Sequence, residues 1–134
     1  MIRIAAIDHV VLRVVDMAAM QHFYVEVLGC HEERRQDDLG LVQLRAGTAL
    51  IDLLAIDGQP GRHGGDAPGN AGHNMDHLCL RVEDYDASTI LAHLHSHGVR
   101  TGEQGVRYGA QGNGPSIYVY DPQGNRLELK AALA

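Results

Sequence analysis

Two histidines and two carboxylates recur at matching places in the two halves of this 134-residue chain. The stretches DHVVLRV (8–14) and DHLCLRV (76–82) agree at five of seven positions and contribute His9 and His77. The later apolar runs LIDLLA and RLELKA contain Asp52 and Glu128. Imidazoles and carboxylates are ligands that first-row divalent metal ions accept without a thiolate. The four residues therefore predict a site for Zn, Ni, Co, Fe or Mn.

Strand periodicity tests whether these polar side chains lie in the core. Side chains on a strand alternate between two faces, so His9 shares a face with Arg13, opposite Val10, Leu12 and Val14. The same alternation puts His77 with Arg81, and it puts Asp52 and Glu128 opposite the apolar residues of their own runs. We therefore expect each half to present one histidine and one carboxylate on a polar face that lines a cavity.

A simpler interpretation is that each carboxylate lies at an exposed edge and each histidine is hydrogen-bonded in place. For one residue alone this interpretation is the better one. The repetition of the pair favours the metal site, because a cation would offset the cost of burying two carboxylates.

The elements that position these residues also repeat. After each histidine strand comes a helical pattern, over 18–29 in the first half and 86–98 in the second. Asp16 and Asp86 are expected N-caps, and Gly29 and Gly98 are expected helix stops. Each half then returns as strands, which gives β-α-β-β with room for one more strand.

These patterns predict one α+β domain built from two modules, about 5–57 and 75–134. The glycine-rich segment 58–74 is expected to be a linker, and a second glycine-rich stretch, 98–115, interrupts the second module. One half is too small to bury a core alone, so we expect the modules to share one core, with both helices on one face of a combined sheet.

Composition excludes several classes of function. The net charge of −6 and the absence of a basic run argue against nucleic acid as a partner. No apolar run reaches 18 residues and no signal-peptide pattern is seen, which predicts a cytoplasmic protein with no membrane contact. Cys30 and Cys79 are far apart and are expected to be free thiols. Both are expected to be small packed residues.

The sequence resembles the vicinal oxygen chelate superfamily, which includes glyoxalase I, extradiol dioxygenases, fosfomycin-resistance thiol transferases and bleomycin-binding proteins. The matching stretches span nearly the whole chain: IDHVVLRVVDM, FYVEVLGC, ALIDLL, MDHLCLRVED, LHSHGV and YVYDPQGNRLEL. The resemblance implies two paired βαβββ modules that form a U-shaped mixed sheet around a metal-binding cavity. It also implies a homodimer whose metal sites take ligands from both subunits, with one divalent metal per site.

Residue by residue, His9, His77 and Glu128 match the ligand positions of the family. Asp52 stands where glyoxalase I has glutamate, and its shorter side chain leaves open whether it ligates. Without it, two histidines and one carboxylate make a facial triad suited to Fe(II) and O₂. Arg13 matches the position at which glyoxalase I holds the glutathione carboxylate.

The expected activity is that of a glyoxalase-like lyase or isomerase acting on a small substrate with vicinal oxygens, including a thiol adduct. Glu128 is the expected base and Asp52 the second candidate. Tyr118, Tyr120 and Arg107 are expected to touch substrate. The alternatives are an Fe(II) extradiol-type dioxygenase, a thiol transferase, and an antibiotic-binding or resistance protein; His9, His77 and Glu128 argue against the last.

Overall fold

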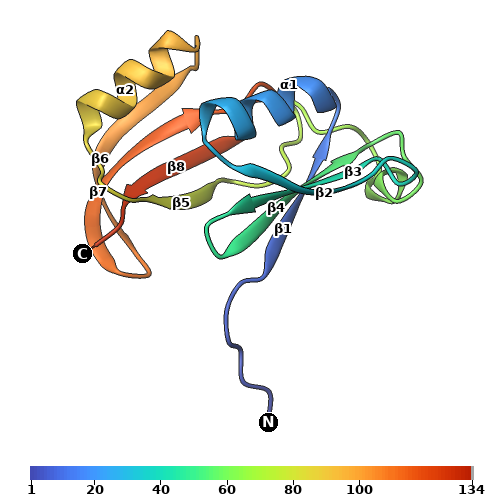
Figure 1. Ribbon diagram of the computed structural model, residues 1–134, viewed down its shortest axis with the longest axis horizontal. Coiled ribbons are helices and arrows are strands. Elements are labelled where there is room, and N and C mark those ends of the chain that lie inside the picture. The colour runs from blue at the N-terminus through green and yellow to red at the C-terminus, as the bar shows by residue number, and fades with distance from the viewer. Residues whose placement is uncertain (134) are drawn as a thin grey trace. The chain divides into compact units, whose positions relative to one another are not determined.

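The computed structural model describes residues 1–133 (Figure 1). The chain divides into two compact units, Met1–Pro68, hereafter module one, and the described residues from Gly69 onward, hereafter module two. This division falls within the segment 58–74 that the sequence suggests as a linker. Each module holds a four-stranded sheet of its own.

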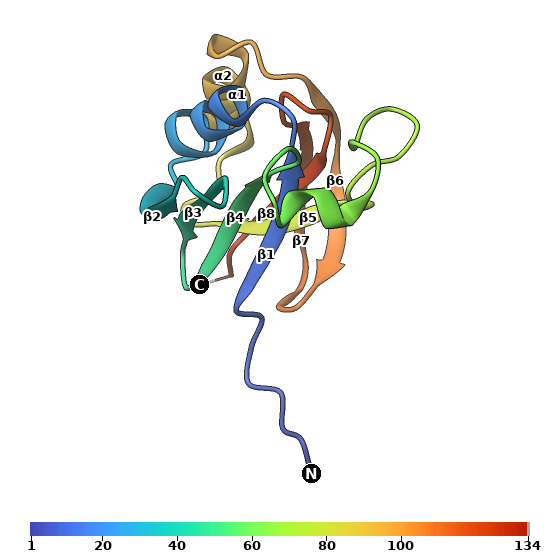
Figure 2. The same ribbon diagram turned by 90° about the vertical axis from the view of Figure 1, so that its right-hand side faces the viewer.

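Module one follows the order strand, helix, three strands. Its elements are β1 (His9–Val14), α1 (Met17–His22), the π-helix η1 (Phe23–Val27), β2 (His31–Gln36), β3 (Leu41–Ala46), β4 (Ala49–Ala55) and the 3₁₀ turn η2 (Gly61–Gly64). The sheet has the order β1-β4-β3-β2, with β1 parallel to β4 and the other pairs antiparallel. Residues 1–8 precede β1 as an irregular exposed segment that extends away from the strand (Figure 2).

Module two repeats this plan. Its elements are β5 (Leu78–Val82), α2 (Ala87–Ser96), β6 (Thr101–Gly109), β7 (Gly112–Tyr120) and β8 (Arg126–Ala131). The sheet has the order β5-β8-β7-β6, again with the first strand parallel to the last. The α+β class and the paired βαβββ modules expected from the sequence are therefore confirmed. The joining of the two sheets into one U-shaped sheet stays a prediction.

The helix boundaries lie where the sequence places them. The Asp16 carboxylate accepts a hydrogen bond from the Ala19 backbone N–H at 3.0 Å, and Asp86 accepts one from Thr89 at 2.9 Å. These bonds satisfy N–H groups that have no partner within the helix. Gly29 and Gly98 follow the helical segments with φ of 82° and 68°, a conformation that glycine adopts without steric cost.

Two local expectations need correction. The helical segment after Asp16 is not one α-helix: at Phe23 it widens into a π-helix, in which Leu28 N–H donates to the Phe23 carbonyl five residues earlier. The glycine-rich stretch 98–115 is no interruption, because it supplies β6 and the start of β7, the further strand of module two.

The core of each module lies on the face opposite the histidine. Leu12, Val14, Ile51 and Leu53 are at most 2% exposed in module one, and Leu127 and Ile117 are fully buried in module two. In module one, α1 packs against the sheet beside β4 (Figure 1). Among residues 1–133, no helix is both long and apolar enough to cross a lipid bilayer.

Candidate functional site

The first candidate pair lies on one face of the module-one sheet. In the parallel register, His9 pairs with Leu50 and Val11 pairs with Asp52, so His9 and Asp52 point to the same side, as the periodicity predicts. Asp52 is only 4% exposed. Its Oδ2 accepts a hydrogen bond from Gln43 Nε2 at 3.1 Å, whereas its Oδ1 is buried without a hydrogen-bond partner.

His9 has its ring fixed by the residue before it. The Nδ1 atom lies 2.6 Å from Asp8 Oδ1. This hydrogen bond, followed by the charge of Asp52, raises the pKa of the His9 imidazole above its ordinary value. The influence of Asp52 indicates that the two candidate ligands sense one another electrostatically.

The second pair repeats this arrangement in module two. Glu128 pairs with Cys79 of β5 and with Tyr118 of β7. Its side chain is 6% exposed, and Oε1 lies 3.4 Å from His77 Nε2. The other oxygen, Oε2, is buried without a hydrogen-bond partner. Both modules therefore bury one carboxylate and leave one of its oxygens unsatisfied.

The surroundings of His77 are polar and connected. Its Nδ1 lies 2.6 Å from Asp76 Oδ2, which also accepts a hydrogen bond from Arg126 Nη2 at 2.7 Å. These two contacts lower the pKa of the Asp76 carboxyl, with the His77 bond the larger cause. The Tyr118 ring meets His77 edge-on at 5.7 Å, and the guanidinium groups of Arg107 and Arg126 lie 4.1 Å and 4.7 Å from its centre.

The donor sets fit a divalent metal ion. A buried carboxylate with an unpaired oxygen is costly, and a cation bound to the same carboxylate would offset that cost. Two ligands bound at about 2.1 Å to one tetrahedral ion lie roughly 3.4 Å apart, and His77 Nε2 and Glu128 Oε1 are separated by 3.4 Å. Within the described residues 1–133, no three His, Cys, Asp or Glu side chains gather closely enough to hold an ion. Each module supplies a pair of candidate ligands.

Arg13 lies on the His9 face, but its guanidinium is engaged with module one itself. It donates to the carbonyls of Gly61, Gly64, Gly65 and Asp66 at 2.7–3.1 Å, which fastens η2 beside β1 (Figure 2). A Cβ on Gly64 would lie 2.2 Å from the Arg13 Nε, so a larger residue there would displace the Arg13 side chain from this position. The sequence does not reveal this anchoring role, and a role of Arg13 in substrate binding stays a prediction.

The other predicted substrate residues lie on module two. Tyr118 borders Glu128 directly, whereas the Tyr120 ring is covered by Arg100 at 3.8 Å. Arg107 is a residue of β6, and its Nη1 donates to the buried Ser116 hydroxyl at 2.7 Å. Arg107 and Tyr118 are thus brought together beside Glu128. Tyr120 lies two residues further along β7, where it pairs with Arg126.

Cys79 differs from the expectation of a packed residue, because it is exposed on the Glu128 face. Partial desolvation, together with the neighbouring Glu128 charge, raises the pKa of the Cys79 thiol to about 11. The thiol therefore stays protonated at neutral pH, which argues against a nucleophile. Cys30 is buried, as expected.

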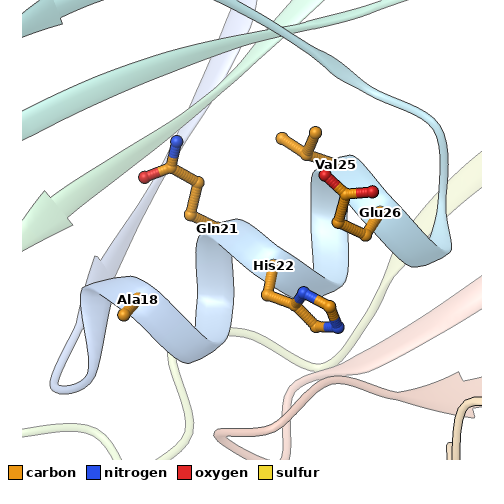
Figure 3. Close-up of a pocket in the computed structure, with 5 residues that line it drawn as sticks. All are labelled: Ala18, Gln21, His22, Val25 and Glu26. Carbon is orange, nitrogen blue, oxygen red and sulfur yellow. The ribbon is translucent and has the colours of Figure 1, made fainter.

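Sequence reasoning overlooked Asp8, Asp76 and Arg126. The signal was available, because the repeated dipeptide DH places an aspartate before each histidine, and Arg126 shares the face of Glu128 in the strand alternation. A separate open hollow runs along α1 and η1 (Figure 3). None of the candidate ligands line it; its side chains are Ala18, Gln21, His22, Val25 and Glu26.

Comparison with known proteins identifies the superfamily that the sequence resembles. The model of the Glyoxalase/Bleomycin resistance protein/Dioxygenase superfamily matches residues 6–129. No curated protein matches the chain. An integron cassette protein from the mobile metagenome of V. cholerae is 27% identical, with a TM-score of 0.77 and 99% of each chain covered.

Two more distant solved structures share the fold. A lactoylglutathione lyase from Agrobacterium tumefaciens is 20% identical with a TM-score of 0.69, covering 96% of this chain and 94% of its own. The fosfomycin resistance protein FosX from Listeria monocytogenes is 17% identical with a TM-score of 0.70, covering 98% and 96%.

Proposed function

Because the chain belongs to the glyoxalase, bleomycin resistance protein and dioxygenase superfamily, we propose that it is a metal-dependent lyase that isomerises a small substrate with two neighbouring oxygens. One observation carries this proposal: each module buries a carboxylate beside a histidine and leaves one carboxylate oxygen unsatisfied. In this proposal His9, Asp52, His77 and Glu128 hold one divalent ion of Ni, Zn, Co, Mn or Fe.

Glu128 is the proposed base. When bound, a divalent ion supplies Lewis-acid stabilisation of charge that develops on two neighbouring substrate oxygens. Glu128 Oε2 has no hydrogen-bond partner, so it is the oxygen that takes a proton from one substrate carbon and returns it to the adjacent carbon. The Asp52 carboxylate is the second candidate for this step, with Oδ1 as its available atom.

Substrate orientation is assigned to the polar side chains beside Glu128. Tyr118 is the strand partner of Glu128, and Arg107 lies over its ring. Together they offer an aromatic surface and positive charge to a polar or anionic group of the substrate. In this proposal Arg13 contributes indirectly, by holding the η2 segment in place. Tyr120 contributes a contact to the substrate at the periphery of the site.

We also propose that the active form is a homodimer whose metal sites combine ligands from both subunits. The placement of one candidate pair in each module supports it, since each pair leaves a metal ion incompletely ligated. Mixing the His9→Ala and His77→Ala variants tests it directly. A shared site regains one intact ligand set in the mixed dimer, so activity returns; a site built within one chain regains none.

An Fe(II) dioxygenase is the second candidate, and the contact of Asp52 Oδ2 with Gln43 favours it. If this contact keeps Asp52 from the metal, two histidines and Glu128 remain as ligands. The assay is hemithioacetal isomerisation with Ni²⁺ or Zn²⁺, against catechol cleavage with Fe²⁺ and O₂. Activity in the first supports the lyase; activity only in the second overturns it. Thiol addition to fosfomycin in the same series tests the thiol-transferase alternative.

A further inference from the structure

We propose that Asp8 and Asp76 are positioning residues that fix which ring nitrogen the following histidine presents to the metal, and that Arg126 and Tyr118 lock this arrangement in module two alone. The inference rests on the proposed function in so far as it concerns metal binding. Its structural half concerns the imidazole rings of the metal-free protein and can be tested separately.

The same contact occurs in both modules. Asp8 Oδ1 lies 2.6 Å from His9 Nδ1, and Asp76 Oδ2 lies 2.6 Å from His77 Nδ1. Neighbouring side chains on a regular strand point to opposite faces. The two contacts form because each aspartate precedes its strand, β1 beginning at His9 and β5 at Leu78. The repeat therefore conserves an aspartate–histidine unit between its halves as well as a single histidine.

This contact selects the ring nitrogen. A carboxylate only accepts hydrogen bonds, so the Nδ1 beside it carries the proton in the neutral ring and Nε2 keeps the lone pair. In module two, Nε2 faces Glu128 Oε1 at 3.4 Å. Two electron-rich atoms at this separation are suited to share a cation. Carboxylates that orient ligating histidines in this way raise metal affinity.

The two modules hold their aspartates differently. Asp76 also accepts a bond from Arg126 Nη2 at 2.7 Å, and the Arg126 guanidinium lies over Tyr118, whose ring meets His77 edge-on. These four side chains close a ring of contacts. In module one the strand partner of His9 is Leu50, which has no hydrogen-bond donor in its side chain, and the Asp8 side chain is 90% exposed. We infer that His77 is held more rigidly than His9.

The first experiment uses the metal-free full-length protein. Nitrogen-15 NMR of the imidazoles, at a pH at which both rings are neutral, reports the tautomer of each. The Nδ1–H form is expected for His77 and His9. Asp76→Asn should convert His77 to a mixture and leave His9 unchanged; Asp8→Asn is the matched control with the reverse effect. Arg126→Met should leave His77 as a mixture of tautomers. If Asp76→Asn does not fold, Asp76→Glu replaces it as a test variant, and because it keeps the carboxylate it should retain the Nδ1–H tautomer of His77.

The second experiment titrates Co²⁺ and follows its visible absorption. Asp76→Asn should weaken binding by about 10–100-fold, and Asp8→Asn by less. Unchanged tautomers and unchanged Co²⁺ affinity in Asp76→Asn would overturn the inference. If the tautomer shifts as expected but the wild type binds no Co²⁺, the positioning role stands and the proposed function fails. If Co²⁺ binds and the tautomer is indifferent to Asp76, the proposed function survives and the positioning role does not.

Discussion

The two modules carry the same histidine–carboxylate pair in different surroundings. Around His9 and Asp52, the residues that share their face on β1 and β4 include the aliphatic Val11, Leu50 and Leu54. Around His77 and Glu128, Arg126 and Lys130 of β8 stand in the places of Leu50 and Leu54, Cys79 stands in the place of Val11, and Tyr118 of β7 stands in the place of Gln43. The comparison teaches that the repeat preserved the candidate ligands, while the residues that flank the carboxylate on its own strand changed from aliphatic in module one to charged in module two.

Burial sharpens this difference. Lys130 is only 3% exposed, and its ammonium group donates to the Gly112 carbonyl at 2.9 Å. Arg107 bonds the buried Ser116. Lys130 is two residues from Glu128 on β8, and Arg107 lies over Tyr118, the strand partner of Glu128. Module one has instead the neutral Gln43 beside its carboxylate. Under the proposed function, this difference is why the base is assigned to module two and a ligand-supplying role to module one.

The largest expected effect comes from removing a histidine. His77→Ala should abolish measurable metal binding and activity, because a direct ligand is worth more than the roughly 100-fold effect of an orienting partner. His9→Ala should weaken metal binding strongly but leave a residual affinity, since His77 remains and is held by Asp76. Calorimetric titration with Ni²⁺ measures both variants. His93 of α2 and His97, which caps that helix, are also changed to alanine, because their rings lie 4.8 Å apart and could bind Ni²⁺ on their own. Wild-type affinity in His77→Ala would refute the proposed site.

The two carboxylates should separate chemistry from binding. Glu128→Gln is expected to lower kcat by about 10²–10⁴-fold, the usual contribution of a general base. Asp52→Asn should chiefly reduce metal affinity, with a smaller change in kcat at saturating metal. Steady-state kinetics at several metal concentrations distinguish the two effects. Equal loss of kcat in the two variants would show that both carboxylates take part in proton transfer, and would contradict the assignment of the base to module two.

The twin arginines offer a test that does not involve metal. Arg13→Met should destabilise module one by about 2 kcal/mol, because charged hydrogen bonds to four backbone carbonyls are lost. The matched variant is Arg81→Met, whose side chain is exposed, and little change is expected. Denaturant unfolding measures the stability, and limited proteolysis should detect new cleavage within 57–68 in the Arg13 variant alone. Equal stability in both variants would contradict the anchoring role.

The smallest effect concerns the two helix caps. Bonds from the Thr89 N–H and from Ser88 hold the pKa of Asp86 below its usual value of 3.8. A folded-state pKa below the unfolded one adds stability above pH 3.8, and this stability is lost as the pH falls through the folded-state value. Asp86→Asn should therefore lower Tm at pH 7 and converge with the wild type in acid. Asp16→Asn, which loses the bond to Ala19, should change Tm less.

Much of this architecture follows from local rules in the sequence. Alternation along β1 and β4 places His9 and Asp52 on one face correctly, because a period of two is inherent to a strand. Asp16 and Gly29 bound the first helical segment for equally local reasons. These features depend on residues a few positions apart, so the sequence states them directly.

The features that escaped prediction depend on contacts distant in the sequence. Arg13 anchors carbonyls about 50 residues away, and Arg126 reaches Asp76 across the same interval. No period or motif encodes such a pairing. The glycines of β6 suggested a loop, but the hairpin partner β7 supplies hydrogen bonds that override the low strand propensity of glycine. Propensity fails there because pairing decides the structure.

The most direct test of the central claim is a count of histidine ligands by X-ray absorption spectroscopy on the Ni²⁺-loaded full-length protein. If the two half-sites hold one ion, the spectrum should show two imidazoles and only nitrogen or oxygen donors. His9→Ala, which is expected to keep a residual affinity, should reduce the count to one imidazole, whereas His77→Ala should retain no Ni²⁺. A spectrum with a single imidazole that is unaffected by His9→Ala, or with a sulfur ligand from Cys79, would contradict the shared site.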